Sequence, residues 1–239
     1  MYKEEDYSRT GTMDNVSPAA VQNAFVNRVY GWMCAGLALT GLAAWYTAHS
    51  ETLLRLLFQK GLMWVLIIAT FVLVVGLSAK IRTISAEAAS AMFAVYSVME
   101  GMLFSSIFLV YNQSSVVTTF FAASLTFGVT SLAGWVTKRD LSGMGRLFFF
   151  ALIGLVIGTL VNLFVGSSGF EMLLTYAGIL IFAGLSAYDT QKIKLMSMNA
   201  GAMAREDGKK LAVFGALMLY LDFINLFLLL LRIFGGRRR

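Results

Sequence analysis

The chain has 239 residues, of which 58% are hydrophobic and 13% are charged. Its mean hydropathy of +0.74 exceeds that of ordinary soluble domains, in which about half of the residues are apolar. This composition excludes a soluble globular domain and predicts an all-α, polytopic membrane protein, since several stretches reach the roughly 20 residues that a spanning helix needs. The net charge of +6 does not indicate a nucleic-acid partner, because the basic residues flank apolar segments, as the orientation of membrane helices requires.

The first residues of the chain are charged and contain no apolar run, so we predict no signal peptide and assign residues 1–28 to a cytoplasmic segment. Ser17 followed by Pro18 is typical of a helix start, with serine as the cap and proline as the first helical residue. We therefore expect a short interfacial helix there, leading into a single transmembrane domain over residues 29–239.

The apolar segments of this domain predict seven transmembrane helices. Their approximate bounds are 29–48, 61–79, 86–110, 116–136, 146–166, 170–190 and 211–234. Lysine and arginine are concentrated before the first segment and in alternate loops, which places the N-terminus in the cytoplasm. Seven crossings put the arginines at 237–239 on the opposite side, where positive charge is disfavoured. A full crossing is still favoured over a re-entrant last segment, because residues 211–234 are long enough to span.

Two aspartates lie within the last two apolar segments, Asp189 in the sixth and Asp222 in the seventh. An ionised carboxylate at the centre of a membrane helix costs about 2.5 to 3.5 kcal/mol on insertion scales, so such residues are candidates for function. If the sixth helix continues past Lys192 and Lys194, and the seventh begins near Arg205, the two carboxylates reach a similar depth. The alternative is that each aspartate separately caps a helix or pairs with a lysine.

Two carboxylates close together in a low dielectric cannot both ionise easily, so the pair would share a proton and act as a pH sensor. Calcium prefers oxygen ligands and relieves the same repulsion, so calcium and protons would compete for Asp189 and Asp222. Asn225 lies on the same helix face as Asp222, and Tyr188 and Tyr220 flank the aspartates, so these three side chains are candidate hydrogen-bond partners or ligand supports.

Three further charged residues are candidates for the same site. Glu100 lies midway along the third segment, where it either extends a line of oxygen ligands or makes a structural hydrogen bond. Lys80 and Arg82 lie at the cytoplasmic end of the second segment and could latch an ionised aspartate. Their alternative role is to mark the topology of the chain from the aqueous side.

The sequence offers little for enzymatic chemistry, and we predict that the protein is not an enzyme. Its only histidine, His49, and its only cysteine, Cys34, do not make a zinc site. Tyr188 and Asp189 match the YD motif of presenilin-type aspartyl proteases. Asp222, however, follows Leu-Tyr-Leu instead of the GxG of those enzymes, which leaves an intramembrane aspartyl protease as a remote alternative.

Two long motifs, AYDTQKI at 187–193 and LYLDFINLFLLLLRI at 219–233, resemble the signature of the Bax inhibitor motif family, including its bacterial YccA-like branch. VNRVYGWMCAGLALTGLAAW at 26–45 and MEG at 99–101 are similar to the same family, so the resemblance spans nearly the whole chain. It implies a seven-helix fold with the C-terminal helix at the centre of the bundle, in a multi-pass protein of the bacterial inner membrane.

The resemblance also implies a calcium leak gated by a pH-sensing aspartate pair, which maps onto Asp189 and Asp222. A basic latch near the end of the second helix maps onto Arg82 or Lys80, and we prefer Arg82. Calcium is then the permeant or transiently bound ion and the lipid bilayer the surroundings, and no cofactor is expected. Some members of this family are implicated in stress survival and in modulating a membrane-bound protease. The alternative function is therefore regulation of a membrane-protein partner.

Overall fold

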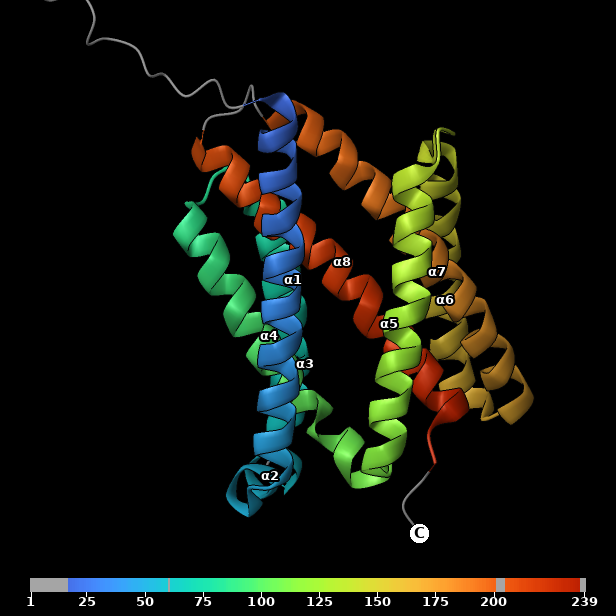
Figure 1. The fold of residues 1–239 in the computed structure, drawn as a ribbon. Coiled ribbons are helices and arrows are strands. Elements are labelled where there is room, and N and C mark those ends of the chain that lie inside the picture. The colour runs from blue at the N-terminus through green and yellow to red at the C-terminus, as the bar shows by residue number, and fades with distance from the viewer. Residues whose placement is uncertain (1–16, 60, 201–204, 237–239) are drawn as a thin grey trace, which may run out of the picture.

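The computed structural model describes residues 17–59, 61–200 and 205–236, and these ranges contain eight helices (Figure 1). They are α1 (Pro18–Ala48), α2 (Glu51–Gln59), α3 (Leu62–Lys80), α4 (Ala86–Val110), α5 (Gln113–Val136), α6 (Ser142–Val165), α7 (Ser168–Asn199) and α8 (Arg205–Phe234). The predictions for residues 1–16 and for the arginines at 237–239 lie outside the described residues.

Six of the described helices, α3 to α8, are long and apolar enough to cross a membrane. The helix α4 has the predicted bounds, and α7 and α8 contain their predicted segments and extend beyond them toward the loop that joins them. Although α1 is 31 residues long, it is not among the helices that are sufficiently apolar, because glycine, threonine and tyrosine alternate with its apolar residues. The polytopic all-α class is confirmed, with six candidate spans where seven were predicted.

The first helix is continuous, with no break between an interfacial part and a membrane part. The Ser17 hydroxyl accepts a hydrogen bond from the Ala20 N–H at 3.3 Å, which confirms the predicted cap. After Pro18 no further proline interrupts the helix, so the expected short helix forms the first turns of α1. The following helix α2 was not predicted, because its nine residues are too few for a span; it buries Leu57 and exposes an ion pair between Glu51 and Arg55.

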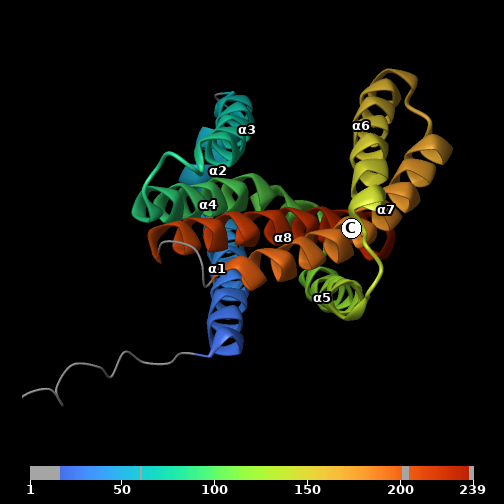
Figure 2. The same cartoon turned by 90° about the horizontal axis from the view of Figure 1, so that it is seen from above.

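The C-terminal helix α8 lies at the centre of the bundle, as the resemblance implied. Two thirds of its apolar window, 67%, is buried inside the molecule, more than in the other candidate spans of the described chain. It packs against α1, α4, α5 and α7, whereas α3 and α6 lie at the periphery, as the view from above makes clear (Figure 2). The small residues Ala212 and Ala216 are fully buried on α8 and allow this close packing.

Contacts at its two ends indicate that α8 crosses the whole depth of the bundle. Near its start, Glu206 Oε1 accepts a hydrogen bond from the Ala86 N–H at 2.7 Å, at the beginning of α4. Just past its end, the Gly236 N–H donates to Ser115 Oγ at 3.1 Å, beside the turn that follows α4. Because α4 and α8 begin together and end together, α8 runs the same depth of the bundle as α4 and does not fold back on itself.

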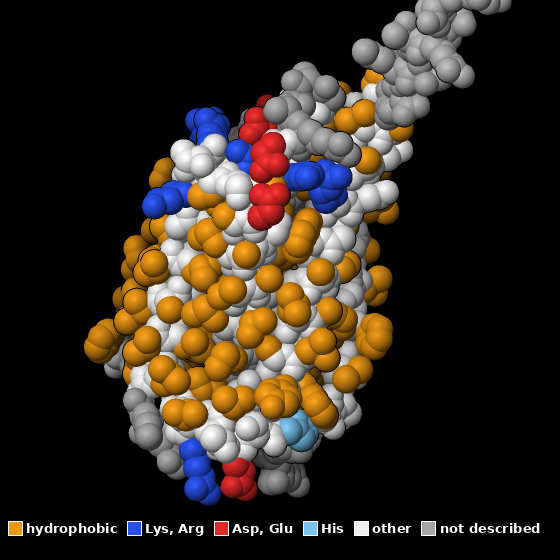
Figure 3. All heavy atoms as spheres, turned by 90° about the vertical axis from the view of Figure 1, so that its left-hand side faces the viewer, with side chains coloured by type: hydrophobic (Ala, Val, Ile, Leu, Met, Phe, Trp, Pro, Cys, Tyr) orange, Lys and Arg blue, Asp and Glu red, His pale blue; other side chains and the backbone are white. Residues whose placement is uncertain are grey.

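The exterior has the pattern expected of a membrane protein. On the face drawn in Figure 3, hydrophobic side chains form a broad belt, while charged side chains gather above and below it. Many large apolar side chains of the long helices are exposed, among them Trp64, Phe121 and Phe150. A hydrocarbon surrounding removes the cost that water would impose on them.

Candidate functional site

The two membrane aspartates line one cavity between α6, α7 and α8. The cavity has a volume of about 680 Å³, and both carboxylates border it. The α7 helix continues past Lys192 and Lys194, and α8 begins at Arg205, which is the arrangement that brings the carboxylates to one depth. The lining residues are Gly145, Arg146, Phe149, Phe150, Leu152 and Val156 of α6, Phe182, Leu185, Tyr188, Asp189 and Lys192 of α7, and Met218, Leu221, Asp222 and Asn225 of α8.

Asp222 is the more deeply placed of the two acids. Its side chain is buried, with 4% of the residue exposed, and Oδ2 has no hydrogen-bond partner within the described part of the chain. A buried polar atom without a partner costs about 1 to 3 kcal/mol, and more when it is charged. The site therefore favours either a proton on Asp222 or a cation beside it.

Two basic residues face the same cavity as the aspartates. Lys192 lies three residues after Asp189 on α7, and its Nζ is 3.5 Å from Met218 Sδ and 5.8 Å from the centre of the Phe214 ring. Arg146 reaches the cavity from α6. Sulfur and aromatic neighbours are weak partners for an ammonium group, so Lys192 keeps donors that can turn to a carboxylate.

The basic residues expected at the site lie elsewhere. Lys80 and Arg82 are exposed at the turn between α3 and α4, and neither lines the cavity. At this turn the Lys210 Nζ donates to the backbone oxygen of Arg82 at 3.4 Å and pairs with Asp207 at 2.9 Å. The structure thus places Lys192 and the exposed Arg146 at the border of the aspartate cavity, and Lys80 and Arg82 outside it.

Two of the predicted neighbours of the aspartates, Tyr188 on α7 and Asn225 on α8, lie at the cavity, as the sequence suggested. Tyr188 lines the cavity and packs so closely on Gly145 that a Cβ at that glycine would come within 2.5 Å of the tyrosine ring. Asn225 also lines the cavity, and its amide donates to the Leu221 oxygen at 2.8 Å. This bond does not use the Asn225 side-chain oxygen, which can accept a hydrogen bond or contact a cation.

Tyr220 points away from the cavity, and this corrects its expected place beside the aspartates. Its hydroxyl lies 2.7 Å from Thr40 Oγ1, and its ring packs edge-on against Phe93 and Tyr96. Residues two apart on a helix project about 200° apart, so Tyr220 faces α1 and α4 while Asp222 faces α6 and α7.

Glu100 belongs to this second polar cluster and not to the cavity of the aspartates. Its Oε1 accepts a hydrogen bond from the Tyr96 hydroxyl at 2.9 Å, and the Tyr96 and Tyr220 rings are 5.7 Å apart. The cavity lining does not include Glu100. The structural hydrogen bond that the sequence left open is therefore present, on the opposite side of α8.

The loop before α6 is tied to α7 next to Asp189, and this positions Arg146. The Gln191 amide donates to the Arg139 oxygen at 2.8 Å, and its oxygen accepts from the Leu141 N–H at 2.8 Å. In the same loop, hydrogen bonds from the Ser142 N–H and hydroxyl hold the pKa of Asp140 below its ordinary value. This contact stabilises the start of α6 at neutral pH and is lost when acid protonates Asp140.

The level of α8 around Asp222 is dry on its other faces. Leu219 is fully buried, and the Phe223 ring packs edge-on against Phe120 and Phe127 at centroid distances of 5.4 and 5.7 Å. No group of three or more His, Cys, Asp or Glu side chains that could hold a metal ion is present in the described ranges. The site is thus a two-carboxylate cavity beside an apolar barrier.

A sequence model described as inhibitor of apoptosis-promoting Bax1 matches residues 22–239, nearly the whole chain. The chain belongs to the Bax inhibitor family. Inner membrane protein YbhL of Escherichia coli (strain K12) is 46% identical over 224 residues, which cover 93% of this chain and 96% of YbhL. An uncharacterized protein of Deinococcus radiodurans is 43% identical over 213 residues, covering 89% and 90% of the two chains, and RP147 of Rickettsia prowazekii is 40% identical over 235 residues, covering 98% and 99%.

One residue at the cavity of this Bax inhibitor family member, Arg146, was missed by reasoning from the sequence. Lys192 was named there, and the alternative that an aspartate pairs with a lysine agrees with the spacing of three between Asp189 and Lys192, which places both on one helix face. Nothing in the sequence singles out Arg146, because its place at the cavity depends on α6 packing against α7.

Proposed function

We propose that this protein is a calcium leak pathway of the bacterial inner membrane, opened and closed by the protonation of Asp189 and Asp222. The observation that carries the proposal is the buried, unpartnered Oδ2 of Asp222 in a cavity shared with Asp189. Such an oxygen is stabilised by a proton or by a cation, so protons and calcium compete for it. With two carboxylates and no larger cluster among the described residues, calcium would pass through and not stay as a resident ion.

The gate of this pathway would be the apolar level of α8. Leu219 and Phe223 lie close to Asp222 in the sequence and are buried, so they form a constriction that ions cannot cross unless α8 shifts. A change in the charge of the cavity alters the preference between two positions of α8. Arg146 and Lys192 would stabilise the ionised form of the pair, in the role that the sequence gave to Arg82.

The proposed topology has seven crossings with a cytoplasmic N-terminus. The helix α1 supplies the seventh crossing, because it runs along α4 for much of its length and its 31 residues exceed the span of a bilayer (Figure 1). Localisation to the inner membrane is inferred from the relative YbhL, which is an inner membrane protein. Neither a cofactor nor an enzymatic activity is part of the proposal.

The proposal is tested by calcium flux into proteoliposomes loaded with a calcium dye, over a series of pH values. Asp189→Asn and Asp222→Asn are compared with Glu171→Gln, a change of the same size on α7, at a carboxylate that is half exposed and does not line the cavity. We expect both aspartate variants to lose the pH dependence of the flux and Glu171→Gln to retain it. Unchanged pH profiles in both aspartate variants would contradict the mechanism.

A second candidate, regulation of a membrane-protein partner, is favoured by the peripheral place of α6. This helix packs against α7 in the described chain, and large apolar side chains along it, such as Leu147, Ile157 and Phe164, are exposed. A regulator would show no calcium flux after purification and would co-purify with its partner. That co-purification would depend on the N-terminal segment or on residues 191–210.

A further inference from the structure

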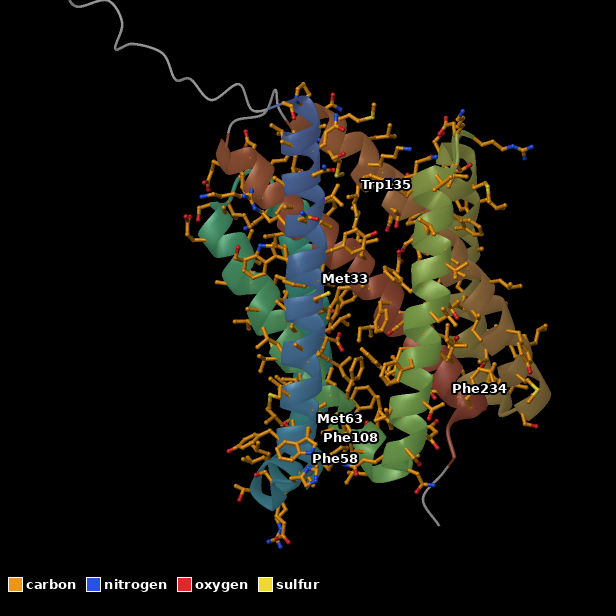
Figure 4. All side chains as sticks on the ribbon, viewed as in Figure 1. Met33, Phe58, Met63, Phe108, Trp135 and Phe234 are labelled. Carbon is orange, nitrogen blue, oxygen red and sulfur yellow. The ribbon has the colours of Figure 1, made fainter. Side chains whose placement is uncertain are left out.

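A groove runs between α1 and α5 on the side of the molecule opposite α6. Both helices pack on α8, but they make no extended contact with each other. Two cavities of about 390 and 500 Å³ fill the space between them, and they share the lining residues Leu37, Phe120 and Phe223. The two cavities therefore adjoin along one groove, and α8 passes behind them between α1 and α5 (Figure 4).

The lining of the groove is suited to hydrocarbon and not to water. We call the cavity of about 390 Å³ the inner half of the groove and the cavity of about 500 Å³ its outer half. Apart from Thr40, the inner half is lined by apolar residues and glycine. The Thr40 hydroxyl is hydrogen-bonded to Tyr220 and to the Ser97 oxygen. No charged side chain lines either cavity. Water in such a space would lose most of its hydrogen bonds, so the groove favours an apolar occupant.

One polar atom in the outer half of the groove has no partner. Ser131 lines the outer cavity and is 5% exposed, and its hydroxyl makes no hydrogen bond to the residues described. A buried hydroxyl is normally paired, so this donor can bond to an acceptor in the groove once the side chains that enclose its oxygen shift slightly.

The mouth of the groove has the chemistry of a membrane interface. Trp135 of α5 and Tyr30 of α1 line it, and amphipathic aromatic rings of this kind are enriched at the headgroup level. The Lys194 Nζ donates to the Trp135 oxygen at 2.6 Å and lies 5.7 Å from the centre of the Trp135 ring. This bond uses one of the three donors of the ammonium group, so two remain for an anion. Lys138 and Arg139 follow at the end of α5, exposed.

We propose that a phospholipid occupies this groove. One acyl chain lies along α8 between α1 and α5. An ester carbonyl of the glycerol accepts a hydrogen bond from the Ser131 hydroxyl, and the phosphate lies near Lys194. Along the groove, the apolar channel comes first, then the Ser131 hydroxyl one helical turn before Trp135, and then the Lys194 cation at the mouth. A phospholipid has its acyl chain, ester and phosphate in the same order. A second copy of the chain or another apolar helix would leave Ser131 and Lys194 without this match.

The lipid would complete the bundle around α8. Its chain contacts Phe223, which lines both cavities and is adjacent to Asp222, and Phe227, which lies one turn further on. The central helix would then rest partly on lipid. This inference does not depend on calcium transport, since it concerns what fills the groove and not what crosses the membrane.

Two glycines allow the groove to be filled without a clash. A Cβ at Gly41 or at Gly128 would meet nothing within 4 Å, and both glycines line the groove. Gly41→Leu and Gly128→Leu therefore place side chains where the acyl chain would lie, and both raise helix propensity. Gly154→Leu on α6 is the matched control, because its Cβ position is equally open but lies outside the groove.

The test is native mass spectrometry of the full chain in detergent after addition of phosphatidylglycerol. We expect one retained phospholipid per chain, and an apparent lipid affinity that falls about tenfold in Gly41→Leu or Gly128→Leu, since excluding two methylenes suffices for that loss. Gly154→Leu should retain the lipid. Equal retention in the groove variants and the control, no retained lipid in the unaltered chain, or a dimer that fills the groove would each overturn the proposal.

The headgroup and ester contacts are tested separately. Lys194→Gln should weaken the binding of phosphatidylglycerol more than that of phosphatidylethanolamine. The change removes a positive charge at the phosphate, and only in phosphatidylethanolamine does the headgroup's own ammonium balance that phosphate. Ser131→Ala should weaken the binding of both lipids equally. It should leave the unfolding temperature of the protein unchanged or raise it, since it removes an unpaired buried hydroxyl. If neither variant alters retention of either lipid, the assignment of the phosphate and the ester to this groove is wrong.

Discussion

At the level of single residues, α8 presents two polar clusters in opposite directions. Asp222 faces the cavity of Asp189, and Tyr220 faces the cluster of Thr40, Tyr96 and Glu100. The two clusters are separated by the body of the helix, so they can be altered independently. One is suited to titration and the other to holding α8 against α1 and α4.

Tyr220→Phe separates these roles. It removes the hydrogen bond to Thr40 and is expected to lower the free energy of unfolding by about 1 kcal/mol, measured by thermal or denaturant unfolding in detergent. The pH profile of the leak should not move, because the tyrosine does not face the cavity. Tyr46→Phe, at a tyrosine that is 65% exposed, is the control and should change neither quantity. A displaced pH profile in Tyr220→Phe would show that the clusters communicate.

The basic residues of the cavity give a second prediction. Lys192→Gln removes a positive charge that favours the ionised aspartates, so the pH profile of the leak should move to higher pH, by about one unit for an interaction of about 1.4 kcal/mol. Arg146→Gln should move the profile in the same direction but less, because Arg146 is exposed and solvent screens its charge. Arg82→Gln and Lys80→Gln should leave the profile in place, because these residues do not line the cavity. The opposite result would restore the latch that the sequence suggested.

At the level of elements, the loop between α5 and α6 depends on Gln191. Gln191→Ala removes two hydrogen bonds to that loop, and with about 1 kcal/mol for each bond the loop should open more often. Hydrogen exchange at residues 137–141 should rise, while exchange in α4 stays constant. Asn199→Ala on the same helix removes an amide bonded within its own turn and should not affect the loop.

Hydrophobic runs and capping residues predicted most helices because these signals are local. The bounds of α4 and the Ser17 cap of α1 follow from them directly. The separate helix α2 was missed because it is shorter than a span and half polar. The neighbours of α6 were beyond prediction. The peripheral helices α3 and α6 are the most apolar of the six candidate spans, with mean hydropathies of 2.6 and 2.5, but hydropathy does not say which helix packs beside which.

The opposite faces of Tyr220 and Asp222 could have been predicted, since helical periodicity fixes them. The position of Arg146 could not, because it is set by which helix packs beside α7. For the molecule as a whole, the sequence left one question open, which is the side of the membrane on which the last helix ends. The hydrogen bonds of Glu206 to the start of α4 and of Gly236 to Ser115 place α8 across the full depth of the molecule.

This arrangement predicts the sidedness of the whole chain. In a Cys34→Ala background, single cysteines are placed at Lys138 in the α5–α6 loop, at Glu51 in α2 and at Gly236 after α8, and each is exposed. A membrane-impermeant thiol reagent applied to intact cells should label Glu51→Cys and Gly236→Cys, and should label Lys138→Cys only after the membrane is opened. Seven crossings with a cytoplasmic N-terminus require this pattern. If Gly236→Cys, like Lys138→Cys, is labelled only after the membrane is opened, the last helix re-enters and returns to the cytoplasmic side. The pathway along α8 would then open on one side of the membrane only.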